Sequence, residues 1–214
     1  MGVENVATVW DADTGQKLLT VSGDSREAGY GIAFSPDGKR LATLDTGQVV
    51  VWDATNGQRL LSLPGKSIGQ TINHLSFSPD GQRLAVANMD GVPKVWNLAT
   101  TTEVISLTGH TALCDGIAYS PDGTRLVTTG WDGTARVWDV VSGRAIVTFT
   151  SHLQPGQSNP PLIGGVAFNP AGRHIFTGGA DGYVREWDAA TGQCTGEVPH
   201  RGEEVAGMHL LGVG

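Results

Sequence analysis

The sequence predicts an all-β protein assembled from repeated four-stranded antiparallel units. Three observations lead to this fold class. Two different landmarks recur along the 214 residues with a period near 43. Apolar residues alternate with other residues before each turn motif, and glycine-rich turns separate the apolar segments. No segment with helical periodicity is longer than ten residues. The chain is therefore expected to be a repeat protein made of short strands.

The first landmark is a turn and the second is a tryptophan. The turn motif recurs with aromatic residues spaced 43, 42 and 49 residues apart: Phe34-Ser-Pro-Asp-Gly38, Phe77-Ser-Pro-Asp-Gly81, Tyr119-Ser-Pro-Asp-Gly123 and Phe168-Asn-Pro-Ala-Gly172. The tryptophans, each followed by Asp or Asn, are spaced 42, 44, 42 and 49 residues apart: Trp10, Trp52, Trp96, Trp138 and Trp187. For both landmarks, the last interval is longer than the one before it by the same number of residues. The two landmarks therefore belong to the same repeat.

Each repeat is interpreted as four short strands in a fixed order. The first strand ends at the aromatic residue of the turn motif. Proline presets φ in that turn, Asp bonds the local backbone and Gly accepts a positive φ. A second strand follows, an Asp-Gly hairpin leads to the strand ending in Trp-Asp, and a fourth strand completes the unit. Repeats of this length with four strands are typical of β-propeller blades.

The repeats divide the chain into complete and partial blades. Residues 3–22 supply a third and a fourth strand, residues 23–65, 66–109, 110–151 and 152–199 form four complete blades, and residues 200–214 resemble one further first strand. A seven-bladed ring would need about 300 residues at this period. We expect a fragment of a longer polypeptide, an irregular five-bladed ring, or a chain that associates with another to cover its open blade faces; we favour the first.

Composition excludes several classes of function. The formal net charge is −7 and no run of basic residues exists, so a nucleic-acid partner is not expected. No apolar stretch approaches the twenty or so residues of a membrane helix, and no secretory signal is present, so a cytoplasmic protein is expected. Cys114 and Cys194 cannot form a disulfide framework and are expected to be buried apolar residues.

The motifs resemble the WD-repeat β-propeller family, in its bacterial type, over almost the whole chain. The third complete repeat is the best copy, with Gly109-His110, Thr128, Asp132 and Trp138. The resemblance implies a buried polar chain in which His110 bonds Thr128 or Asp132, and the hydroxyl of Thr128 bonds the Trp138 indole. Buried polar groups need such partners.

The other repeats depart from that pattern. The fourth has His152, Thr177, Asp181 and Trp187, with Ser151 in place of Gly and a longer loop at residues 152–161. The second has Val86 and Lys66 at the Thr and His positions, and the first has Asp24 at the His position. We therefore expect the first two complete blades to be less stable than the third.

No motif points to catalysis, a cofactor or a metal. Asp11-Ala-Asp13-Thr-Gly15 is similar to a fragment of a calcium loop, but its counterparts lose the second carboxylate and keep the Gly, so it is interpreted as a hairpin turn. The histidines show no zinc-ligand spacing, and neither a nucleophile elbow nor a phosphate-binding loop is present. An enzyme that uses the propeller channel is the least favoured hypothesis.

The remaining hypothesis is a non-catalytic scaffold for protein–protein interaction that presents one end of the propeller. The resemblance implies contact positions at the start of first strands and before the hairpin Asp. The chosen candidates are Trp131, Met89, Tyr30, Leu113, Asp115, Asn73 and Leu162, and the same positions elsewhere hold Leu44, Ala180 and Gly164. The expected partner is a protein or peptide, with no membrane involved. The alternative is a sensor or regulatory part of a larger bacterial signalling protein linked to a kinase or nucleotide switch.

Overall fold

The computed structural model describes residues 4–23, 31–45, 48–63, 72–88, 90–150 and 163–199. These residues form one two-stranded sheet and four four-stranded sheets, all antiparallel. The prediction of an all-β fold with four-stranded blades is therefore confirmed. Within these ranges, no helix is long and apolar enough to cross a membrane.

The sheets follow one another along the chain. The half blade contains β1 (Glu4–Trp10) and β2 (Lys17–Gly23). Blade 1 contains β3 (Ile32–Phe34), β4 (Arg40–Asp45), β5 (Gln48–Asp53) and β6 (Arg59–Ser62). Blade 2 contains β7 (Ile72–Phe77), β8 (Arg83–Asn88), β9 (Lys94–Asn97) and β10 (Thr102–Ser106). Blade 3 contains β11 (Cys114–Tyr119), β12 (Arg125–Gly130), β13 (Ala135–Asp139) and β14 (Ala145–Phe149). Blade 4 contains β15 (Ile163–Phe168), β16 (His174–Gly179), β17 (Tyr183–Asp188) and β18 (Cys194–Pro199).

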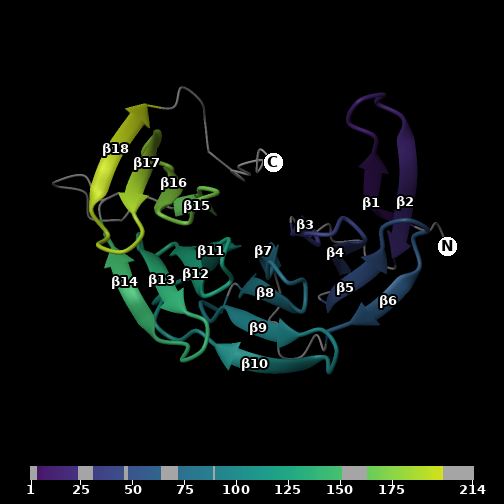
Figure 1. Ribbon diagram of the computed structural model, residues 1–214, viewed down its shortest axis with the longest axis horizontal. Helices are drawn as coiled ribbons and strands as arrows, with labels where there is room; N and C mark the ends of the chain where they lie inside the picture. Colours follow the sequence, from purple (N-terminus) through teal and green to yellow (C-terminus); the bar gives the residue numbers. More distant parts are fainter. Residues whose placement is uncertain are drawn as a thin grey trace.

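The sheets are arranged along an open arc, as Figure 1 shows. The first strand of each complete blade lies on the inner side of the arc, and the fourth strand lies on its outer rim (Figure 1). The inner strands β7, β11 and β15 contact one another in sequence. This radial order of strands is that of a partial β-propeller.

The turn motif closes the first hairpin of each complete blade as the sequence predicts. In blade 3, the Gly123 N–H donates to the Ser120 carbonyl (2.9 Å), and Gly123 has a φ of +70°. A positive φ of this kind favours glycine. The hydrogen bond from the Ser120 hydroxyl, together with the Thr124 backbone N–H, lowers the pKa of Asp122 to about 2. The Asp of the motif therefore stays ionised and anchors the turn.

The apolar core lies between blades rather than within one sheet. Alternate residues of a strand point to opposite faces. In blade 2, Leu84 and Val86 pack against blade 1, whereas Ala85 and Ala87 pack against blade 3. Each repeating tryptophan of the complete blades faces the preceding blade or half blade, Trp96 among them. Large side chains on one face thus meet smaller ones on the next blade, which allows close packing.

An arginine at the start of the second strand joins neighbouring blades on the side of the turn motif. Arg40 donates from Nη2 to the Gly81 carbonyl (2.8 Å), and its guanidinium lies 5.6 Å from the centre of the Phe77 ring. Arg125 makes the same pair of contacts: its Nη2 donates to the Gly172 carbonyl (2.8 Å), and its guanidinium lies 5.6 Å from the centre of the Phe168 ring. A planar guanidinium suits this combination of stacking and hydrogen bonding.

The interface between blades 2 and 3 differs from the other two. Tyr119 replaces the phenylalanine, and among the described residues Arg83 makes neither of these contacts. A cleft of 320 Å³ lies beside Arg83 and Tyr119. A cleft of 280 Å³ also lies beside Arg40 and Gly81, so the arginine contacts, and not the clefts, distinguish these two interfaces. The three described interfaces of this kind are therefore not equivalent.

One expectation about the cysteines is wrong. Cys114 is buried, as predicted, and burial raises the pKa of its thiol. Cys194 is exposed instead. It begins β18, the outermost strand of blade 4, where side chains lie largely in solvent.

Candidate functional site

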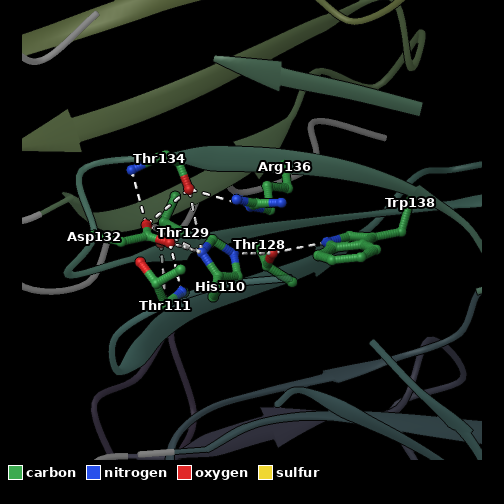
Figure 2. Close-up of polar contacts among 9 residues, drawn as sticks. His110, Thr111, Thr128, Thr129, Asp132, Thr134, Arg136 and Trp138 are labelled. Atoms are coloured by element: carbon green, nitrogen blue, oxygen red, sulfur yellow. Dashed lines mark hydrogen bonds and ion pairs between the residues drawn. The ribbon is translucent and has the colours of Figure 1, made fainter. Parts of the chain in front are cut away.

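A chain of polar side chains crosses blade 3 from its core to one end (Figure 2). The Trp138 indole N–H donates to Thr128 Oγ1 (2.8 Å), and Thr128 Oγ1 lies 2.7 Å from His110 Nε2. His110 Nδ1 lies 3.0 Å from Asp132 Oδ2. A buried hydroxyl needs an acceptor, so Thr128 donates to Nε2. Nδ1 then carries the proton that His110 donates to Asp132.

Asp132 collects further donors from both loops at this end. The backbone N–H of Thr111 donates to Oδ2 (3.0 Å), and the Thr134 hydroxyl donates to Oδ1 (2.7 Å). Burial by itself would raise the pKa of Asp132. The hydrogen bonds from His110, Thr111 and Thr134 outweigh burial and hold that pKa well below its ordinary value.

The network holds two segments of blade 3 together. It ties the segment that precedes β11 to the hairpin between β12 and β13, and the Trp131 backbone N–H reinforces this by donating to the Leu113 carbonyl (2.8 Å). The Thr128 hydroxyl is fully buried, and its oxygen contacts both the Trp138 indole and His110. Sequence reasoning missed Thr111 and Thr134; the Thr after the Asp-Gly pair was the available signal for Thr134.

The other blades keep different parts of this network. In blade 4, Trp187 donates to Thr177 Oγ1 (2.8 Å), and Asp181 pairs with Arg185. His152 lies outside the described residues. In blade 1, Trp52 donates to Thr43 Oγ1 (2.8 Å), although the sequence has no histidine at the matching position.

Blade 2 has no threonine hydroxyl at the position that Thr128 occupies in blade 3. Trp96 Nε1 is buried and has no hydrogen-bond partner among the described residues. The residue that would supply the partner is Val86, which is fully buried. Among the described residues, only packing contacts therefore hold this tryptophan in blade 2.

The hairpin held by the blade 3 network carries an exposed tryptophan. Trp131 precedes Asp132 in the turn between β12 and β13, and 38% of its surface is exposed. Its Nε1 lies 3.5 Å from Asp115 Oδ2 on β11. Leu113, partly exposed, immediately precedes β11. The structure thus brings together three of the predicted contact residues.

The remaining predicted contact residues are not tested by this arrangement. Tyr30, Met89 and Leu162 lie outside the described residues, as do the loop at 152–161 and residues 200–214. Asn73 lies on β7. Leu44 is buried in the core between blades 1 and 2, so its placement among surface positions is wrong. It packs there because its position on β4 faces blade 2.

The acidic turns form hydrogen bonds within themselves. Asp11 Oδ1 accepts from the Thr14 backbone N–H and from the Thr14 hydroxyl, both at 2.7 Å. Asp53, Asp139 and Asp188 accept in the same way from a Thr or Ser of their own turn. In the part of the chain that the structure describes, no three His, Cys, Asp or Glu side chains gather so as to hold a metal ion.

Comparison with known protein families agrees with this architecture. Residues 15–53, 101–139 and 143–188 match the family described as WD domain, G-beta repeat. Residues 43–113 are similar to the WD40 domain of anaphase-promoting complex subunit 4. No curated protein matches the sequence. The bacterial type of the resemblance stays a prediction. The repeat matches cover more than half of the chain, which therefore belongs to the WD40 repeat family.

Proposed function

We propose that this chain is a non-catalytic scaffold that presents the Trp131 end of blade 3 to a protein or peptide partner. WD40 repeats generally mediate protein–protein interaction. The observation that carries the proposal is the exposed Trp131 side chain, held beside Asp115 on a hairpin that the buried network anchors.

A rigid, exposed tryptophan is well suited to be a binding anchor. Tryptophan is enriched among residues that dominate binding energy, and a side chain with few free torsions loses little entropy on binding. The hydrogen bonds of Asp132 with Thr111 and Thr134 fix the loops on both sides of Trp131. Its position is thus set before a partner arrives, which reduces the cost of ordering.

The non-catalytic part of the proposal rests on the family and on the network. WD40 repeat domains are typically non-catalytic scaffolds. The polar groups of blade 3 are engaged with one another rather than with an open cavity. The regulatory part of a larger signalling protein stays a prediction, which the parent open reading frame would test.

The experiment compares two variants in partner capture. Immobilised parent chain, Trp131→Ala and Val141→Ala are incubated with cell extract, and the bound proteins are quantified by mass spectrometry. Val141 is a matched control, because it is 89% exposed and lies on the turn between β13 and β14, at the other end of β13. We expect Trp131→Ala to reduce recovery of the specific partner about tenfold or more, and Val141→Ala to leave it unchanged.

The chosen end would be wrong if Trp131→Ala retained the partner. A loss with Val141→Ala alone would place the interaction at the opposite end of blade 3. The unfolding midpoints of both variants are measured alongside. We expect both to match the parent, because Trp131 and Val141 are exposed and lie outside the core clusters.

A further inference from the structure

The first strand of blade 1 exposes two apolar side chains. On β3, Ile32 is 43% exposed, and Phe34, the aromatic residue of the turn motif, is 49% exposed. The residues at the same two positions of the other complete blades are at most 8% exposed: Leu75, Phe77, Ile117, Tyr119, Val166 and Phe168. Blade 1 therefore exposes an apolar surface that blades 2, 3 and 4 bury, and such surfaces mark interaction sites.

The sheet that precedes blade 1 explains this exposure. In the later blades, the first strand contacts the first and second strands of the blade before it: β7 contacts β3 and β4, β11 contacts β7 and β8, and β15 contacts β11 and β12. Blade 1 follows the half blade, which stands at one end of the arc and in which the structure describes β1 and β2 (Figure 1). β1 carries Trp10, so it corresponds to a third strand, like β5 with Trp52. Among the described residues, no first or second strand therefore precedes β3.

Two interfaces elsewhere in the chain show which chemistry covers the aromatic position. The Phe77 and Phe168 rings each have a guanidinium 5.6 Å from the ring centre, supplied by the preceding blade. The same guanidinium donates to the carbonyl of the turn glycine, Gly81 or Gly172, at 2.8 Å. In both cases the arginine begins the second strand of its blade. An arginine at the start of a strand is therefore the side chain that fits beside this aromatic residue and this glycine.

The turn of blade 1 is built like a turn that receives an arginine. Gly38 has a φ of +68° and donates its N–H to the Ser35 carbonyl (2.8 Å), and Gly81 has a φ of +65° and the same bond to Ser78 (2.8 Å). A Cβ added to Gly81 would lie 2.6 Å from Arg40 Nη2, whereas a Cβ added to Gly38 would meet no atom beyond its chain neighbours within 4 Å. The space that a guanidinium occupies beside Gly81 is therefore open beside Gly38.

β1 offers a strand edge next to this open space. In blade 3, the second strand pairs with the third strand so that Arg125 lies opposite Asp139 and Leu126 lies opposite Trp138. β1 pairs with β2 on one side, and within the described ranges no strand pairs with its other edge. Such an edge is a template for a further strand. In the register of blade 3, an arginine at the start of the added strand lies opposite Asp11.

We propose that the Phe34 ring, the Gly38 carbonyl and the edge of β1 away from β2 form a docking site for an extended segment of a partner polypeptide that begins with an arginine. The guanidinium stacks on the ring and donates to the carbonyl, two contacts that its planar shape allows together. The residue two positions later is apolar, because Ala42 and Val127 at that position face the next blade. The site lies in a different blade from Trp131 and goes beyond the proposed function.

Charge favours a partner segment over a second copy of this chain. The chain carries a net charge of −7, so two copies repel each other, whereas a segment that bears an arginine is attracted. A segment that begins with a glutamate or an apolar residue gives the Gly38 carbonyl no side-chain donor. A basic, otherwise apolar segment therefore fits the ring, the carbonyl and the strand edge together.

The test measures the binding of labelled peptides to the full chain by fluorescence anisotropy. The probe is Arg-Leu-Val-Thr-Thr, the sequence of Arg125–Thr129, acetylated at its N-terminus and labelled at its C-terminus. Two matched peptides carry Gln or Glu in place of Arg. We expect the Arg peptide to bind saturably at one site per chain, the Gln peptide to bind roughly tenfold more weakly, and the Glu peptide not to bind.

Two variants and one further readout locate the bound peptide. Phe34→Ala removes the ring and should weaken binding of the Arg peptide about fivefold. Ile146→Ala is the matched control, because Ile146 is 52% exposed on β14 of blade 3, and it should leave binding unchanged. In the parent chain, the bound peptide should slow hydrogen exchange of the β1 amides and leave the amides of β14 unchanged.

Defined results would overturn this docking site. They are equal binding of the Arg and Gln peptides, the same affinity in Phe34→Ala and Ile146→Ala, or unchanged exchange of the β1 amides. Full protection of the β1 amides without peptide would show that this chain already covers the edge, and sedimentation at two concentrations would show whether a second copy does so; either result would rule out a partner segment. Trp131→Ala should leave peptide binding unchanged, so the docking site and the proposed function fail separately.

Discussion

Blades 2 and 3 hold their tryptophans in the same place by different means. Trp96 is 2% exposed and Trp138 is 1% exposed, and each packs against the blade before it. Beneath Trp138, Thr128 accepts the indole hydrogen bond and extends the network to His110. Beneath Trp96, Val86 supplies no acceptor.

The comparison separates two roles: packing buries the tryptophan, and the polar network fixes the loops. Packing is sufficient to bury a repeating tryptophan, because Trp96 is buried and has no polar partner in the part of the chain that the structure describes. The network adds something else: it joins the buried indole to the loops at the Trp131 end. A buried polar network whose groups all have partners favours a single conformation. In blade 3, the network favours a single conformation of the loops beside Trp131.

The largest expected effect comes from making blade 3 like blade 2. Thr128→Val keeps the shape but leaves Trp138 Nε1 and His110 Nε2 buried without partners. We expect the free energy of unfolding to fall by about 2–6 kcal/mol, at about 1–3 kcal/mol for each of the two unsatisfied groups. Urea denaturation measures the change. Thr148→Val on the exposed face of β14 is the matched control and should change stability little. A loss as small as that of the control would mean that packing alone stabilises both blades.

The arginine contacts allow a second comparison between interfaces. Arg125→Gln removes the bond to the Gly172 carbonyl and the stacking on Phe168. We expect a loss of about 1.5 kcal/mol, because a charged donor is lost at a partly exposed site. Arg83→Gln should cost much less, since Arg83 makes neither contact among the described residues. Equal losses for the two variants, measured by urea denaturation, would show that the interfaces are energetically alike.

The charge of Asp132 makes the stability of blade 3 depend on pH. The pKa of Asp132 lies below that of an unfolded Asp, which is about 3.9. The stabilisation of the folded state by ionised Asp132 is therefore present above about pH 4, and it is lost as the pH falls through the folded-state pKa. We expect Asp132→Asn to be less stable than the parent by about 1 kcal/mol near neutral pH, allowing for solvent screening.

Unfolding experiments between about pH 6 and pH 2 test the sign of this effect. The difference between the parent and Asp132→Asn should shrink as the pH is lowered. A constant difference over the whole range would show that the carboxylate stabilises through shape rather than charge.

The smallest expected effect is the reverse change in blade 2. Val86→Thr gives Trp96 an acceptor, but the sequence has Lys66 where blade 3 has its histidine, so the new hydroxyl hydrogen has no imidazole acceptor. We expect a gain of about 0.5 kcal/mol in the free energy of unfolding. Val104→Thr on β10 is the exposed control. A marked loss of stability in Val86→Thr relative to this control would contradict the shared role of the two positions.

Much of the fold could be predicted because its signals are local. The turn motif has a proline and a glycine at fixed positions in all four copies, and Gly123 adopts the positive φ expected there. The turn of blade 4 forms even with Ala171 in place of the acidic residue. Strand alternation and the tryptophan period are likewise visible along the chain. These features depend on a few residues that are close in sequence, so they can be recognised without knowledge of tertiary contacts.

The candidate site could be predicted less completely. Trp131 was recognisable because it is the one tryptophan outside the repeating position. Its neighbour Asp115 lies 16 residues earlier, and their meeting depends on how β11 pairs with β12. Leu44 occupies a comparable sequence position and is buried, because the face of β4 on which it lies packs against blade 2.

The sequence by itself determined the period, the four-stranded repeats, the turns and four residues of the blade 3 network: His110, Thr128, Asp132 and Trp138. Each follows from side-chain chemistry at short spacing. Only the tertiary structure decided which indole has a partner, which arginine reaches the next blade, and which apolar side chain stays in solvent. Those outcomes depend on the register between strands and on the packing between blades, where residues far apart in the chain compete for the same space.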